Sequence, residues 1–387
     1  MVLARRDGEG RAPVAAGLFC AVAGLLLLRP APADAGAAHE STGWRPTAIP
    51  LWNYSSDDGT GYGVRANLYE YDGRTVPYRR KYSAQLFFTT GGKWVHRLLM
   101  DTPRFRGGGD RLEVELVYEK EEFANYYGGL SKEETRGLDR DQRTFSQAFP
   151  ELKVRWIRPL GSAGGPTPWR LRLGSRLSYH EITPNAEAGN ILAEQDPLGA
   201  DGGPLAQAGA ALRYDTRDNY NDSSSGLLEE LVVQYTLGAG GDYNGLQARL
   251  EHRHFASPLP GLVAAHRIAF DWTAGDLPFY EELALGGSST VRGLPKARDR
   301  GEARVLLNGE LRWRGVRLSS AQNIHLGGLL FADAGQIFAG GEWPAAGDWR
   351  RGAGLGLRFL WQSTIVRADH GFSGGGSGIY ITFSQLF

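Results

Sequence analysis

The sequence predicts an all-β protein, a transmembrane antiparallel up-and-down β-barrel of about sixteen strands. The first observation is composition: 54 glycines, 16 tyrosines, 16 phenylalanines and 10 tryptophans in 387 residues indicate many strands and turns. The second is the alternation of apolar and polar residues in short segments along the whole chain. The third is the ending, an amphipathic strand whose last residue is Phe387. No linker follows residue 45, so we expect one large unit.

The first residues predict export. Arg5, Arg6 and Arg11 precede an apolar run over 14–28, and small residues follow at 33–35, which is the order of a secretory signal peptide. A membrane anchor is the alternative, but the run is short for a spanning helix. The only cysteine, Cys20, lies in this run, so no disulfide is expected in the mature chain. We therefore expect a signal peptide at 1–35, a short periplasmic segment at 36–45 and an integral outer-membrane barrel at 46–387.

Alternation with period two recurs in segment after segment. In 112–119, for example, Leu112, Val114 and Leu116 alternate with Glu113 and Glu115. A soluble sandwich would bury the apolar face, whereas a membrane barrel turns it to lipid and lines its lumen with the charged face. The alternation recurs about sixteen times without an intervening helix, which gives more strands than a typical sandwich has. Tryptophans also tend to fall near strand ends, where interfacial girdles form. These features favour the membrane barrel.

An even number of strands places both ends of the chain on the periplasmic side. The longest connections, 125–143, 183–204, 275–302 and 339–349, then lie outside the cell, and we expect 130–138 to be a charged loop rather than a helix. The inward faces carry both charge signs, which favours interior ion pairs over an ion-selective pore. Lys+Arg and Asp+Glu both total 43, and this balance argues against a nucleic-acid partner.

Short motifs occur in order along the second half of the chain. Residues 286–294 read GGSSTVRGL, 214–218 YDTRD, 308–312 NGELR and 331–335 FADAG. In this order, and with Phe387 at the end, they resemble the BamA/TamA-type outer-membrane barrels, the bacterial surface antigen family. The matching positions are Gly286, Gly287, Val291, Arg292, Gly293, Asp215, Arg217, Asn308, Phe331 and Gly335, with Leu294 in place of the family's usual aromatic residue.

The resemblance implies that the loop carrying Arg292 folds back into the barrel, where Arg292 pairs with Asp333 and Glu310 as a structural lock. A guanidinium offers a planar fork for carboxylates, and the flanking glycines permit tight turns. The alternative is that Arg292 is a solvated loop residue. Asp215 and Arg217 are either a family packing and assembly signature or ordinary lumen charges. Phe387 resembles the residue by which the outer-membrane assembly machinery recognises its substrates.

No catalytic residue, cofactor or metal site is expected. Gly371, Ser373 and Gly375 fit the G-x-S-x-G pattern, but that pattern requires a strand-to-helix elbow and here falls at a hairpin tip. His252 and His254 share a strand face and could chelate a metal, although a position near the periplasmic interface without metal is the favoured interpretation. The sequence contains no HExxH, no P-loop and no cysteine pair.

The resemblance further implies a barrel that helps to insert or translocate protein or lipid across the outer membrane. The expected partners are outer-membrane lipid and lipopolysaccharide, the assembly machinery during biogenesis, and a separately encoded periplasmic protein, since a first strand near Arg45 leaves no room for a POTRA module. The alternative is a passive or structural barrel, a plugged pore or surface antigen, without client-insertion activity.

Overall fold

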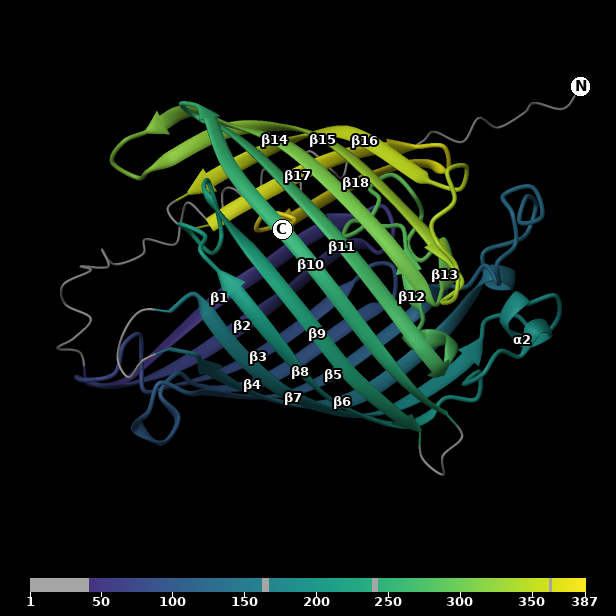
Figure 1. Ribbon diagram of the computed structural model, residues 1–387, viewed down its shortest axis with the longest axis horizontal. Helices are drawn as coiled ribbons and strands as arrows, with labels where there is room; N and C mark the ends of the chain where they lie inside the picture. The colour runs from purple at the N-terminus through teal and green to yellow at the C-terminus, as the bar shows by residue number, and fades with distance from the viewer. Residues whose placement is uncertain (1–41, 162–166, 239–242, 362–363) are drawn as a thin grey trace, which may run out of the picture.

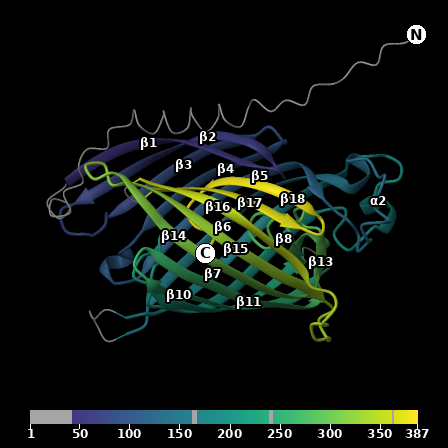
Figure 2. The ribbon, with the colours of Figure 1, turned by 90° about the horizontal axis from the view of Figure 1, so that it is seen from above.

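The computed structural model describes residues 42–161, 167–238, 243–361 and 364–387, and it forms a closed barrel (Figures 1 and 2). Strands β1 to β11 follow one another around the barrel, β14 pairs with β11, and β18 closes the barrel on β1. Every neighbouring pair is antiparallel. The predicted antiparallel barrel is therefore confirmed, while the expected signal peptide at 1–35 lies outside the described residues.

The barrel strands are 8 to 17 residues long. In chain order they are β1 (Thr42–Ser55), β2 (Gly59–Asp72), β3 (Arg80–Thr89), β4 (Lys93–Thr102), β5 (Arg111–Asn125), β6 (Thr144–Pro159), β7 (Trp169–Pro184), β8 (Gly203–Asp215), β9 (Gly226–Gly238), β10 (Asn244–Leu259), β11 (Leu262–Asp276), β14 (Ala303–Ser319), β15 (Ile324–Phe338), β16 (Arg350–Trp361), β17 (Thr364–Ser373) and β18 (Gly376–Phe383).

Two short strands, β12 (Leu283–Leu285) and β13 (Asp299–Gly301), form a separate sheet within the connection between β11 and β14. The helix α2 (Ile191–Gln195) and the 3-10 turns Phe105–Gly107, Asp141–Arg143 and Phe279–Glu281 complete the regular structure. In the described part of the chain, no helix has the length and apolar character to cross a membrane.

The structure differs from the sequence expectations at both ends of the barrel. β1 begins at Thr42, inside the segment 36–45 that was expected to be periplasmic, because its ladder with β2 continues to the Thr42–Asp72 pair. β18 ends at Phe383 rather than at 387, because Ser384 adopts φ 70° and turns the chain out of the ladder. The segment 130–138 forms turns without a helix, as expected.

Helix α2 was not expected from the sequence. Asn190 begins it, because its Oδ1 accepts hydrogen bonds from the N–H groups of Leu192 and Ala193. The Asn190 amide in turn donates to the carbonyls of Asp141 and Thr144, which ties the helix to the loop before β6. The cap is therefore part of the packing between two loops, and this packing is not visible in the local sequence.

The two faces of the barrel wall differ as the alternation requires. On β14, Leu311 and Trp313 are exposed on the outer face, whereas Asn308, Glu310 and Arg312 are buried on the inner face. An apolar outer face with a charged lining is the arrangement that lipid outside and polar contacts inside would stabilise. We call the buried side the inner wall.

The long loop, residues 277–302 between β11 and β14, lies against this inner wall. Its residues Leu285, Val291 and Leu294 form one buried apolar cluster with Ala269 of β11 and Leu306 of β14. Both strand residues belong to the inner wall, so the cluster joins the loop to the barrel from within. This packing places the loop motif beside the charged residues of β14 to β17.

Candidate functional site

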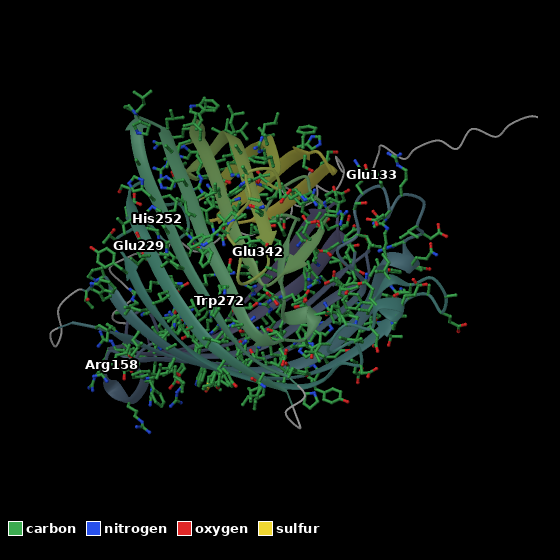
Figure 3. The ribbon with its side chains drawn as sticks, turned by 45° about the vertical axis from the view of Figure 1, so that its right-hand side comes forward. Glu133, Arg158, Glu229, His252, Trp272 and Glu342 are labelled. Atoms are coloured by element: carbon green, nitrogen blue, oxygen red, sulfur yellow. The ribbon has the colours of Figure 1, made fainter. Side chains whose placement is uncertain are left out.

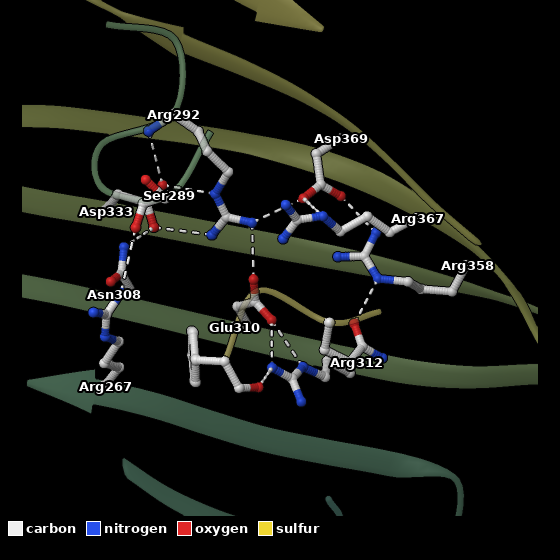
Figure 4. A network of polar contacts seen from close by, with 12 residues as sticks. Arg267, Ser289, Arg292, Asn308, Glu310, Arg312, Asp333, Arg358, Arg367 and Asp369 are labelled. Carbon is white, nitrogen blue, oxygen red and sulfur yellow. Dashed lines mark hydrogen bonds and ion pairs between the residues drawn. The ribbon is translucent and has the colours of Figure 1, made fainter. Parts of the chain in front are cut away.

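Arg292 of the long loop makes more side-chain hydrogen bonds than the other arginines around it. Its Nε and Nη2 donate to Asp333 Oδ2 and Oδ1 at 2.8 and 2.9 Å, a bidentate pair. Its Nη1 donates to Glu310 Oε1 at 2.8 Å and to Asp369 Oδ2 at 3.0 Å (Figure 4). We call Arg292, Asp333, Glu310 and Asp369 the Arg292 network. One guanidinium thus joins the loop to carboxylates on three strands.

Every side chain of the Arg292 network is completely excluded from solvent. The Arg292 N–H adds a backbone hydrogen bond to Asp333 Oδ2 at 3.1 Å, and the ring of Phe331 lies 3.5 Å from the guanidinium carbon. Asn308 donates to Asp333 Oδ1 and to the Thr290 carbonyl, both at 2.8 Å. The guanidinium is therefore held by charge, by a π face and by a fixed backbone.

Further arginines compensate the remaining carboxylate charge. Arg312 donates from Nε to Glu310 Oε2 at 2.8 Å, and Arg358 pairs with Asp369. These arginines also reach the end of the chain: Arg312 donates to the Phe387 carbonyl at 3.1 Å and Arg358 to Gln385 Oε1 at 2.8 Å. The network therefore extends from the long loop to residues 384–387.

The glycines of the loop motif are required by its backbone. Gly286 and Gly293 have φ of 114° and 91°, which favour glycine. A Cβ on Gly293 would lie 2.8 Å from the Gly371 carbonyl carbon, and one on Gly352 would lie 2.3 Å from the Arg292 carbonyl oxygen. Glycines on both partners thus allow the loop and the strands to approach backbone to backbone.

The long loop also contacts both sides of the junction between β1 and β18. The Gly293 N–H donates to the Tyr380 hydroxyl at 3.1 Å, and the Lys296 N–H donates to Asp57 Oδ1 at 3.2 Å. Burial raises the pKa of Asp57 to about 6, although the hydrogen bond from Lys296 opposes the shift. Tyr380 belongs to β18, whereas Asp57 lies in the turn after β1. The loop therefore bridges this junction.

The β1–β18 seam is short. Its register consists, in the described residues, of Tyr54↔Ile381 and Ser55↔Tyr380, whereas the ladder of β1 with β2 runs over the whole of β1. Among the described residues, the remainder of β1 has no strand partner on that side, because β18 is only 8 residues long and the chain then turns inward. The barrel is closed, but this seam closes it with few backbone hydrogen bonds.

The structure brings together most of the residues named from the sequence, but not all of them. Gly286, Gly287, Val291, Leu294, Asn308, Phe331 and Gly335 lie in or beside the Arg292 network, Leu285 packing against Gly335. Asp215 and Arg217 instead pair with each other at 2.9 Å at the end of β8. Phe387 is buried against Phe255.

Sequence reasoning missed Asp369, Arg358 and Tyr380 as members of this site. Asp369 was not among the residues expected at this site, and the structure places it on the inner wall at 1% exposure. Its signal was available: Arg367 and Asp369 share one face of β17, whereas Val366, Ala368 and Phe372 lie on the other. Residues 371–375 form the hairpin between β17 and β18, without a strand-to-helix elbow.

Comparison with known proteins places this architecture in a family. The Omp85 superfamily domain matches residues 88–373. Among curated proteins no sequence matches the chain. Among solved structures, the chain is similar to BamA from Haemophilus ducreyi lacking POTRA domains 1–3, with a TM-score of 0.63, 14% identity, and coverage of 88% of this chain and 70% of that one.

CdiB from Escherichia coli is similar with a TM-score of 0.58 and 12% identity, over 89% of this chain and 63% of that one. At these identities the structural likeness concerns the fold, and the family rests on the domain match. The expected resemblance to BamA/TamA-type barrels is thus confirmed at the level of the family. The chain belongs to the Omp85 superfamily, whose barrel makes it an integral outer-membrane protein.

Proposed function

We propose that this barrel inserts or translocates protein or lipid across the outer membrane, with the β1–β18 seam as the place where a client engages. The observation that supports this most directly is the short register of the seam, Tyr54↔Ile381 and Ser55↔Tyr380. Opening it breaks few hydrogen bonds compared with any other pair of neighbouring strands. The activity is the one that family membership makes the leading candidate.

The free part of the β1 edge has the chemistry that a client strand needs. An unpaired strand edge is a template on which another strand can add backbone hydrogen bonds. A cavity of about 350 Å³ reaches this edge: Leu51 and Asn53 of β1 and Thr382 and Phe383 line it at the seam, and its remaining lining lies mostly on β2 to β5, including Arg65 and Lys93. A client strand would therefore add to this edge of β1 as the seam opens.

The Arg292 network would act as the lock that keeps the long loop in position beside the seam. Arg292 fixes the loop to β14, β15 and β17. The same loop contacts Tyr380 on one side of the seam and Asp57 on the other. Release of the loop would remove both contacts together, so the state of the lock would bias the seam between closed and open.

A passive, plugged barrel is the second candidate, and the buried network favours it in one respect. The long loop fills part of the lumen, and Arg292 is completely buried there. A barrel that served only as a plugged scaffold would show the same loop, but it would engage no client strand at β1.

Crosslinking at the seam distinguishes the two candidates. Tyr54→Cys with Ile381→Cys would join β1 to β18 by a disulfide, while Val64→Cys with Leu86→Cys would join β2 to β3 as the control. Directly opposed residues of antiparallel strands have a spacing suited to a disulfide. A photocrosslinker at Ala48 on β1 would report bound clients in cells.

We expect protein clients to crosslink at Ala48 in the control barrel and in the reduced seam variant, and to be lost when the seam disulfide forms. A photocrosslinker at Leu231, on the outer face of β9, provides the matched site away from the seam. Equal protein capture with the seam closed and open would contradict the proposed route. Capture of lipid alone at both positions would support the passive barrel.

A further inference from the structure

Three histidines and one glutamate form a polar cluster on the outer face of the barrel. His252 and His254 belong to β10, His266 to β11 and Glu229 to β9. Figure 3 shows Glu229 and His252 next to each other on neighbouring strands. We call these four residues the histidine cluster. It lies outside the lumen and takes no part in the Arg292 network.

The position of the cluster is unusual for such side chains. Leu250 precedes His252 on the outer face of β10 and Ile268 follows His266 on that of β11, and both are exposed apolar residues. Towards the turns, Leu262 of β11 faces the exposed Trp313 of β14. The histidines therefore lie within the apolar belt, close to its aromatic border, where polar side chains mark a functional site more often than in water.

The side chains of the cluster are oriented towards one another. Glu229 Oε1 lies 2.6 Å from His252 Nδ1, and His252 Nε2 lies 3.2 Å from His266 Nε2. His254 is directly opposite His266 in the β10–β11 register. The ring centres are 5.2 Å apart for His252–His266 and for His254–His266, and 6.4 Å apart for His252–His254.

These spacings are close to those of imidazoles around one transition-metal ion. With Zn–N bonds of about 2.0–2.1 Å and tetrahedral angles, two ligand nitrogens lie about 3.3 Å apart and their ring centres about 5 Å apart. A carboxylate on the remote ring nitrogen is the usual second partner of a metal-binding histidine. Glu229 has this position on His252, which leaves Nε2 of His252 directed at His266.

We propose that the histidine cluster binds a divalent transition metal of the zinc type through His252, His254 and His266, with Glu229 orienting His252. In the described residues no three His, Cys, Asp or Glu side chains already surround a common metal position. His254 must therefore turn about its side-chain bonds to complete the site, a change that its half-buried position on the outer face permits.

Such a site would have two consequences for the barrel. The metal would join β10 to β11 through their side chains, and Glu229 would extend this connection to β9. Three protein ligands leave a fourth tetrahedral position open for water or for a donor group from another molecule. The site would thus stabilise β9 to β11, which lie far around the barrel from the β1–β18 seam. It does not depend on the proposed insertion activity.

The test is a titration of the purified full-length barrel, carrying no polyhistidine tag, with Zn²⁺ by calorimetry and with Cu²⁺ by electron paramagnetic resonance. We expect one saturable site, and nitrogen hyperfine structure from three imidazoles. His252→Gln, His254→Gln and His266→Gln should each weaken binding at least about tenfold, and Glu229→Gln about tenfold, as for loss of an outer-shell partner.

His96→Gln is the matched control, because His96 also lies on an outer face but packs edge-to-face with Phe88 and stacks on Tyr118, away from other histidines. It should bind zinc like the unchanged protein. The proposal is overturned if the protein has no saturable site, if His252→Gln or His266→Gln binds as tightly as His96→Gln, or if His254→Gln leaves binding and the three-nitrogen spectrum unchanged.

Discussion

Two parts of the lumen wall pair their charged side chains but differ in how far those side chains are exposed to solvent. In the Arg292 network all four side chains are excluded from water. On β5 and β6, Arg155 pairs with Glu113 at 2.9 Å and with Glu115 at 3.2 Å, but its side chain keeps 35% exposure. Both parts arise from the same alternation of charged residues on strands. They differ because the long loop covers only one of them.

The difference teaches that burial, rather than the number of ion pairs, decides what a lumen charge contributes. A solvent-exposed pair contributes about 0–1 kcal/mol, because water screens it and the side chains lose freedom. Removal of one partner from a buried pair costs about 3–5 kcal/mol, because the other charge remains desolvated without compensation. Substitutions in the two parts should therefore have very different effects.

Arg292→Ala should have the largest effect. It leaves Asp333, Glu310 and Asp369 without their shared cation, so we expect a loss of about 3–5 kcal/mol in the stability of the docked loop, while the barrel itself still forms. One measurement is proteolysis of the long loop. The other is the temperature to which a sample must be heated before the band of the compact barrel is lost on an electrophoresis gel. Unchanged values in both would show that Arg292 is no lock.

Asp333→Asn should have the next largest effect. The amide keeps the shape of the side chain but loses the charge that accepts the bidentate pair from Arg292, so about 1.5–3 kcal/mol of loop stability should be lost. The same two measurements apply, with Asp215→Asn as control, because among the described residues Asp215 pairs only with Arg217, at the turn end of the barrel. Equal losses in the two variants would contradict a specific role for Asp333.

A pH dependence of smaller size should come from Asp57. Its pKa is about 6 when the loop is docked and near its ordinary 3.8 when it is released. The docked form therefore takes up a proton as pH falls through 6, and docking should strengthen from pH 7.5 to pH 5 and level off below 3.8.

Asp57→Asn should remove that part of the pH dependence while the hydrogen bond from the Lys296 N–H can persist. The measurement is the melting temperature of the compact form at pH 5 and pH 7.5 in both proteins. If the variant and the unchanged protein respond to pH alike, Asp57 does not sense the docking of the loop.

Arg155→Ala should have the smallest effect, less than about 1 kcal/mol, because water already solvates much of its side chain. Neither the melting temperature nor proteolysis of the long loop should change measurably. A loss as large as that of Arg292→Ala would mean that both parts of the lumen wall are equally coupled, and the distinction drawn from burial would fail.

Much of the fold follows from local patterns. Alternation with period two separates Leu112 from Glu113 on β5 whatever surrounds the strand, so the strands and their faces could be predicted. The inward positions of Asp333 and Glu310 follow from the same parity, and the family motif suggested Arg292 as their partner. Helix α2 could not be predicted, since its Asn190 cap depends on contacts with another loop.

The sequence by itself determined the barrel, the faces of its strands and the glycine-flanked arginine, because these depend on residue type and on spacing along the chain. Only the tertiary structure decided that Asp369 shares Arg292 with Asp333 and Glu310, that β18 pairs with little of the β1 edge that faces it, and that His252 and His266 face each other. Each of these joins strands or loops that are distant in sequence. Their geometry depends on barrel closure and register, which no local pattern contains.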